Sequence, residues 1–168
     1  MKNDIITEFE STFADLEAAL EKFDENKFNL IPFEGSWSAA QVADHLLQSN
    51  NISVNTLTGG VIESNRDPDE NEAAIRSAMM DFETKTNAPD FVLPSVEIIN
   101  KDEILDCFRT SGSKLRSILI EEDLTKLCTD FPLPVIGELT RYEWLCFTIC
   151  HTKRHTNQIN NIFKNLEQ

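Results

Sequence analysis

The sequence has few basic side chains and no long apolar run. Lysine and arginine number 15 against 29 acidic residues, which gives a formal charge of −14. Because phosphate contacts need a basic face, this balance argues against nucleic-acid binding. No segment approaches the roughly 18 apolar residues that a membrane span needs, and the opening MKNDIITEFESTF has no apolar signal region. We therefore expect a cytoplasmic protein without a membrane or nucleic-acid partner.

Several common catalytic motifs are also missing. The sequence contains no GxGxxG or GKS/GKT phosphate loop, no Ser-His-Asp signal and no repeat of fixed period. The four cysteines, Cys107, Cys128, Cys146 and Cys150, come without a secretory signal, so we expect reduced thiols that behave mainly as small buried hydrophobes. Cys146 and Cys150 are four residues apart, which leaves a pair of thiolate ligands as the alternative.

Four segments carry apolar residues at the three- and four-residue spacing of a helix, at about 4–26, 38–58, 100–119 and 140–166. Ser38 with Gln41 and Thr140 with Glu143 fit capping boxes at two of the helix starts. The link at 61–99 is long, with a short helix expected in AAIRSAMMDF and an extended stretch in APDFVLPS. We predict an all-α fold in one domain, residues 1–168. It is a four-helix bundle with a long crossover connection between the second and third helices.

All three histidines fall where such a bundle could bring them together. His151 and His155 are four residues apart, so they share one face of the last helix, and His45 lies near the start of the second. Three neutral imidazoles would leave open positions on a divalent metal, which is typical of catalytic sites. The alternative is that each histidine is an ordinary buried side chain with a hydrogen-bond partner. The spacing favours a metal site at His45, His151 and His155.

Three motifs, in order along the chain, resemble a known family. GELTRYEWLCFTICHTKRHTNQINNI, residues 137–162, is similar to the last helix of the DinB/YfiT-like metalloenzyme superfamily. SWSAAQVADHLLQSN resembles its first histidine motif, and KTNAPDFVLPS the extended segment before its third helix. The resemblance implies a DinB-like four-helix bundle that binds one divalent metal through His45, His151 and His155.

Other residues near the histidines are weaker candidates. Gln158, three residues after His155, is a candidate partner for its second ring nitrogen. Gln41 and Gln48 are candidates for contacting a water on the metal, whereas Asp44 is expected at the surface. Arg154 is expected to pair with a carboxylate at a helix end or to bind an anionic substrate. Asp102, Glu103, Asp106, Glu138 and Glu143 are the acids near the helix ends, and the sequence assigns none of them as general base.

The resulting prediction is a metal-dependent enzyme that acts on a small molecule, either as a hydrolase or as a thiol S-transferase. A metal held by three neutral ligands keeps its charge and can activate water or a thiol. Zinc and nickel are both expected, because three imidazoles discriminate weakly between them. A non-catalytic bundle that binds metal or a partner is the alternative. Bundles of this kind often pair through apolar faces, so a homodimer is expected.

Overall fold

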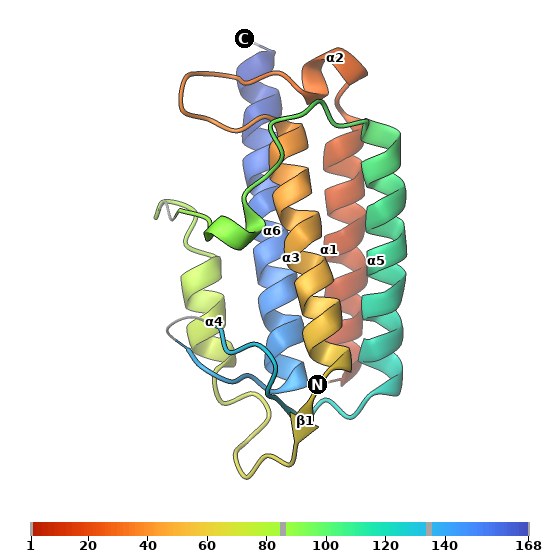
Figure 1. The fold of residues 1–168 in the computed structure, drawn as a ribbon, viewed down its shortest axis with the longest axis vertical. Coiled ribbons are helices and arrows are strands. Elements are labelled where there is room, and N and C mark those ends of the chain that lie inside the picture. The colour runs from red at the N-terminus through yellow and green to blue at the C-terminus, as the bar shows by residue number, and fades with distance from the viewer. Residues whose placement is uncertain (1, 85–86, 134–135, 168) are drawn as a thin grey trace.

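Four long helices run side by side along the molecule (Figure 1). In this computed structural model they are α1 (Lys2–Glu21), α3 (Ala39–Thr58), α5 (Lys101–Glu121) and α6 (Arg141–Leu166). The structure describes residues 2–84, 87–133 and 136–167. None of the helices in these ranges is long and apolar enough to cross a bilayer. The predicted all-α four-helix bundle is confirmed.

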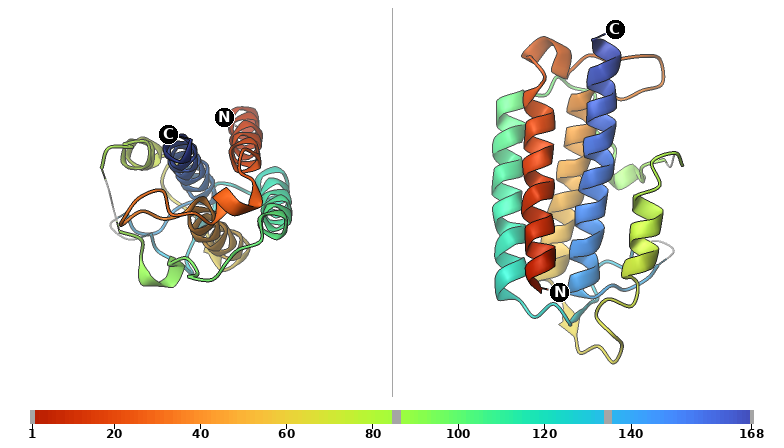
Figure 2. Two further views of the ribbon diagram at one scale, coloured as in Figure 1. Left: turned by 90° about the horizontal axis from the view of Figure 1, so that it is seen from above. Right: turned by 180° about the vertical axis from the view of Figure 1, so that it is seen from behind.

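The helices follow an up, down, down, up order (Figure 1). Seen from above, they stand at the corners of a square, and α6 packs against both α1 and α3 (Figure 2). Helices α3 and α5 are neighbours that run in the same direction, so the chain must return along the bundle between them. This return is the predicted long crossover.

Polar caps place the helix starts where the sequence predicted them. The Ser38 hydroxyl accepts from the Gln41 N–H and the Gln41 side chain accepts from the Ser38 N–H, and Thr140 with Glu143 repeats the arrangement. The first helix is shorter than predicted, because α1 ends at Glu21. A separate short helix, α2 (Glu25–Phe28), follows with its own N-cap, Asp24.

The bundle interior contains two apolar clusters, one toward each end. One includes Trp144, Leu145 and Leu115, and the other includes Phe23, Leu46 and Phe108. Buried polar residues that belong to neither cluster lie along the same helices: Asn50, Ser53, Ser111, Thr148 and Thr152. The hydroxyls of Thr148 and Ser53 hydrogen-bond across α6 and α3 at 3.0 Å. Helices α3 and α6 are thus joined by polar as well as apolar contacts.

The crossover and the connection between α5 and α6 contain short elements that pack on the outside of the bundle. A two-residue antiparallel ladder joins β1 (Val61–Ile62) to β2 (Leu127–Cys128), and α4 (Glu72–Met79) packs against α6. The segment APDFVLPS, predicted as extended, instead contains a 3₁₀ turn, η1 (Asp90–Val92). Pro89 and Leu93, on either side of the turn, are extended as predicted. The prediction was wrong for Asp90–Val92 because the turn buries Val92, at 4% exposure, and a local sequence signal cannot show that contact.

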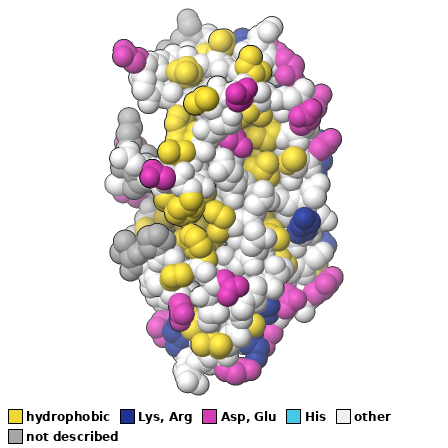
Figure 3. Space-filling view, in the orientation of Figure 1, with side chains coloured by type: hydrophobic (Ala, Val, Ile, Leu, Met, Phe, Trp, Pro, Cys, Tyr) yellow, Lys and Arg dark blue, Asp and Glu magenta, His cyan; other side chains and the backbone are white. Residues whose placement is uncertain are grey.

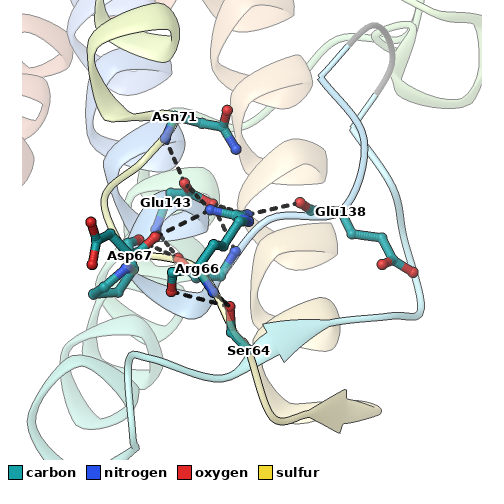
Figure 4. Close-up of polar contacts among 8 residues, drawn as sticks. Ser64, Arg66, Asp67, Asn71, Glu138 and Glu143 are labelled. Atoms are coloured by element: carbon teal, nitrogen blue, oxygen red, sulfur yellow. Dashed lines mark hydrogen bonds and ion pairs between the residues drawn. The ribbon is translucent and has the colours of Figure 1, made fainter.

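A buried ion pair holds the start of the crossover to the first turn of α6 (Figure 4). The Glu143 side chain is fully buried and accepts from both terminal nitrogens of Arg66, each at 2.6 Å. It also accepts from the N–H groups of Asn71, at 2.7 Å, and Thr140, at 2.9 Å. These donors lower the pKa of the Glu143 carboxyl although burial opposes them. Glu143 therefore has a structural contact for each oxygen and is not available as a general base.

Candidate metal centre

The three histidines converge between α3 and α6. Ring centroids lie 4.4 Å apart for His151 and His155, 4.7 Å for His45 and His155, and 5.3 Å for His45 and His151. One nitrogen from each ring lies within 4.8 Å of the other two. Helix α6 contributes two of the rings because residues four apart share a face. Side chains more than a hundred positions apart in the chain thus meet in one cluster, as the sequence predicted.

Hydrogen bonds fix which nitrogen of two rings faces the centre of the cluster. Nδ1 of His45 lies 2.8 Å from the Val92 carbonyl oxygen, and Nδ1 of His155 lies 2.8 Å from Oε1 of Gln158. Both partners are acceptors, so each Nδ1 carries the proton and each Nε2 presents its lone pair. The predicted contact between Gln158 and His155 is confirmed.

The donor set suits a divalent cation. Nε2 of His155 lies 3.0 Å from Nε2 of His151. Two nitrogens that are each about 2.1 Å from a zinc ion lie roughly 3.0–3.4 Å apart at ligand angles of 90–110°. Without a cation this contact is a hydrogen bond, in which Nε2 of His151 carries the proton, and a cation would take the place of that proton. The three neutral imidazoles therefore fit a divalent metal.

The surroundings keep these imidazoles neutral. Burial lowers the pKa of His155 to about 4, with a further contribution from His45. Burial is also the main cause that lowers the pKa of His45, against the opposing effects of the Val92 carbonyl and Asp44. The pKa of His151 falls well below its ordinary value through burial and through His155, His45 and Arg154. A metal near neutral pH would thus compete with few protons for these ligands.

Asp44, Gln41 and Gln48 hold the crossover onto α3. The Asp44 carboxylate accepts from the Ser95 N–H at 2.8 Å and from the Gln48 amide at 3.0 Å. Gln48 also donates to the Leu93 carbonyl, and Gln41, which completes the cap of α3, donates to the Ser95 carbonyl at 3.5 Å. The prediction that Gln41 and Gln48 contact a metal water finds no support in these bonds. Their partners instead place η1 beside His45.

Among the residues that the structure describes, Arg154 hydrogen-bonds to backbone carbonyls and to no carboxylate. Its guanidinium donates to the carbonyl oxygens of Met79, Asp81 and Thr84, at the end of α4 and just beyond it. Lys153 beside it pairs with Glu8 at 2.6 Å. These contacts thus occupy both basic side chains of this stretch of α6, Lys153 and Arg154. The sequence did not predict the carbonyl partners, because they belong to a segment whose path depends on the tertiary structure.

The cysteine pair lies on the side of α6 that faces Arg76 of α4. Cys146 and Cys150 are fully buried, and the guanidinium of Arg76 donates to the Cys150 sulfur at 3.7 Å. The four thiols are free in the structure, and three of them are buried. The prediction of small buried residues is therefore confirmed for Cys128, Cys146 and Cys150, whereas Cys107 is exposed.

Two neighbours of the histidines were missed by sequence analysis. The Val92 carbonyl orients His45 from the crossover, and the Phe147 ring stacks on His151 with centroids 5.3 Å apart and planes 15° apart. Phe147 precedes His151 by four residues, so its place on the same face was available from the sequence. The contact of Val92 with His45 could not be predicted from the sequence, because any backbone carbonyl can serve as acceptor.

Apolar side chains gather on the molecular face that η1 helps to form (Figure 3). Phe91 and Leu93, within and next to η1, are 55% and 49% exposed. No histidine side chain shows on this face among the residues described. Around η1, the described residues therefore present an apolar exterior on this face.

Comparisons with known proteins agree with this architecture. The family profile of the DinB superfamily matches residues 8–159. The uncharacterized protein YuaE of Bacillus subtilis (strain 168) is 29% identical over 161 residues, which cover 90% of this chain and 96% of YuaE.

Two solved structures share the fold. The four-helix bundle protein TT2238 has a TM-score of 0.61 at 17% identity, over 96% of this chain and 99% of its own. YfiT from Bacillus subtilis, described as a probable metal-dependent hydrolase with an unusual four-helix bundle topology, has a TM-score of 0.63 at 16% identity. That match covers 99% of this chain and 87% of YfiT. At these identities the likeness concerns the fold alone.

Proposed function

The chain belongs to the DinB superfamily, and from this premise we propose that it is a metal-dependent enzyme that acts on a small molecule. In this proposal His45, His151 and His155 hold one divalent cation, zinc or nickel. The observation that carries the proposal is the convergence of one nitrogen from each ring within 4.8 Å. When bound, the cation acts as a Lewis acid that polarises a carbonyl group and lowers the pKa of a water or thiol nucleophile.

In this proposal the protein's own residues bind the cation and orient the histidine rings. The Val92 carbonyl and Gln158 hold Nδ1 of His45 and His155, which directs the Nε2 lone pairs inward. The Val92 carbonyl of the crossover lies against His45, which is 4% exposed, so bulk water has little access to this side of the cluster. A neutral set of three ligands leaves coordination positions for a substrate, as catalytic sites require.

Hydrolysis is the first candidate reaction, because YfiT, which shares the fold, is described as a probable metal-dependent hydrolase. Thiol S-transfer is the second. It is favoured by the engagement of Asp44, the residue before His45, in a structural contact with the Ser95 N–H. A thiol that is acidified at the metal needs no carboxylate base, whereas efficient hydrolysis usually employs one.

Metal content tests the proposal directly. Protein purified without an affinity tag is expected to contain about one divalent metal per chain by elemental analysis. His151→Ala and His155→Ala are expected to lose it, and His45→Ala to weaken it. Asn161→Ala, at an exposed position of the same helix, is the matched control and should retain the metal. Full occupancy in all three histidine variants would place any metal elsewhere.

A second measurement separates an enzyme from a non-catalytic metal-binding bundle. In a cobalt-substituted protein, azide or a small thiol should change the visible spectrum if coordination positions are open. A spectrum that no added ligand changes would favour the non-catalytic alternative. Activated esters and thiol-conjugation substrates then distinguish the two reactions. The expected homodimer stays a prediction, which light scattering can check.

A further inference from the structure

The three histidines differ in how their rings are supported. His45 and His155 each have a hydrogen-bond acceptor at Nδ1, the Val92 carbonyl and the Gln158 amide oxygen. Within residues 2–84, 87–133 and 136–167, Nδ1 of His151 has no such partner, and its one hydrogen bond is the contact of Nε2 with His155. An imidazole without an acceptor at Nδ1 is free to rotate about its side-chain bonds unless packing prevents it.

Packing supplies that restraint through Phe147. Its ring lies nearly parallel to the imidazole of His151, with planes 15° apart and centroids at 5.3 Å. Phe147 lies one helical turn before His151, so the backbone of α6 fixes the separation of the two side chains. An offset stack of this kind opposes a change in the plane of either ring.

Other aromatic rings hold Phe147 in place. The Trp144 ring meets Phe147 edge to face, at 5.6 Å and 85°, and Phe131 meets Trp144 at 6.1 Å. Phe91 of η1 in turn meets Phe131 at 5.6 Å. Trp144 is 1% exposed, so the stack on His151 is backed by the rigid interior of the bundle and not by solvent.

We propose that Phe147 is the positioning residue for His151. Its ring takes the role that hydrogen bonds take for the other two ligands: it sets the plane of the imidazole and hence the direction of the Nε2 lone pair. The inference rests on the proposed metal function, because the direction of that lone pair matters only when a metal is bound. It adds a residue that touches no metal and offers no ligand atom.

The chain offers a matched control on the same helix. Phe163 is also partly buried and makes an edge-to-face contact, with Phe23 at 5.2 Å, but it lies three helical turns beyond His151. Phe147→Leu and Phe163→Leu therefore remove a similar aromatic contact at different distances from the cluster. Phe147→Trp keeps a stacking surface and serves as the rescue variant.

The experiment measures cobalt(II) and zinc(II) affinity by competition with a chelator and records the visible spectrum of the cobalt form. Phe147→Leu is expected to weaken metal binding about three- to tenfold and to alter the ligand-field bands. Phe163→Leu should leave metal affinity within about twofold of the wild type and the ligand-field bands unchanged, even if it lowers the melting temperature as much as Phe147→Leu does. Phe147→Trp should restore most of the affinity. Circular dichroism of the metal-free variants confirms that each one is folded.

The possible failures are distinguishable. A wild-type protein that binds no cobalt or zinc defeats the proposed function and this inference together. If the wild type binds metal and Phe147→Leu matches it in both affinity and spectrum, the inference alone is overturned. Equal losses in Phe147→Leu and Phe163→Leu would also overturn it, because the effect would then be one of general stability.

Discussion

Replacing Glu143 with glutamine tests how much the crossover depends on its buried ion pair. The substitution keeps the side-chain shape and removes the charge that faces Arg66 (Figure 4). Glutamine also serves in a capping box, so the bond to the Thr140 N–H need not be lost. With that bond kept, however, the amide nitrogen would face both Arg66 and the Asn71 N–H, and both of these groups are donors.

The expected cost follows from the burial of the two partners. Breaking a buried ion pair by removing one partner costs about 3–5 kcal/mol in the free energy of unfolding. The Glu143 side chain is fully buried, but Arg66 is 23% exposed and also donates to the Glu138 carbonyl. Water can therefore solvate part of the guanidinium, so we expect a loss of about 3 kcal/mol. For a chain of this length that corresponds to a fall in melting temperature of about 6–12 °C.

Urea and thermal unfolding followed by circular dichroism measure this loss. Glu17→Gln is the control, because Glu17 pairs with Arg109 at the surface, where the side chains are 38% and 54% exposed. That substitution should cost less than about 1 kcal/mol. A loss below 1 kcal/mol for Glu143→Gln would refute the reasoning, since the pair would then act like a surface one. Well below the melting temperature, metal affinity should stay unchanged, because Glu143 lies two helical turns before His151.

Three further predictions concern the histidine cluster and the end of α3. Because the pKa of His155 is about 4, the unfolded chain binds protons between pH 6.5 and 5 that the folded chain does not. The unfolding free energy of the metal-free protein should therefore fall by at least about 1.5 kcal/mol over this range in urea titrations, and by less in His155→Leu. Gln158→Leu should weaken zinc binding about 10- to 100-fold in a chelator competition, whereas Gln158→Glu keeps the acceptor and should bind zinc more tightly than Gln158→Leu. Equal zinc affinities for Gln158→Leu and the wild type would argue against a role for this contact. Gly59→Ala would place a methyl group 2.1 Å from an oxygen of Asp130, whose carboxylate accepts from the Gly60 N–H. It should cost roughly 1 kcal/mol in urea unfolding, and less in a background that carries Asp130→Ala.

The sequence predicted the helices because their signals are local. Apolar spacing marks the buried faces, and the caps at Ser38 and Thr140 mark two starts that the structure confirms. The histidine cluster was also predictable, since His151 and His155 share a face by helical periodicity and the chain has only one other histidine. The length of the 61–99 link indicated a crossover.

The tertiary structure alone decided how these parts are supported. The Val92 carbonyl beside His45, the acceptors of Arg154 and the pairing of Arg66 with Glu143 all depend on the path of the crossover over the bundle. From the sequence alone, a backbone carbonyl or a long charged side chain could pair with many different groups. Only packing selects one of them, and for that reason the sequence indicated the three histidines whereas the fold determined what orients them.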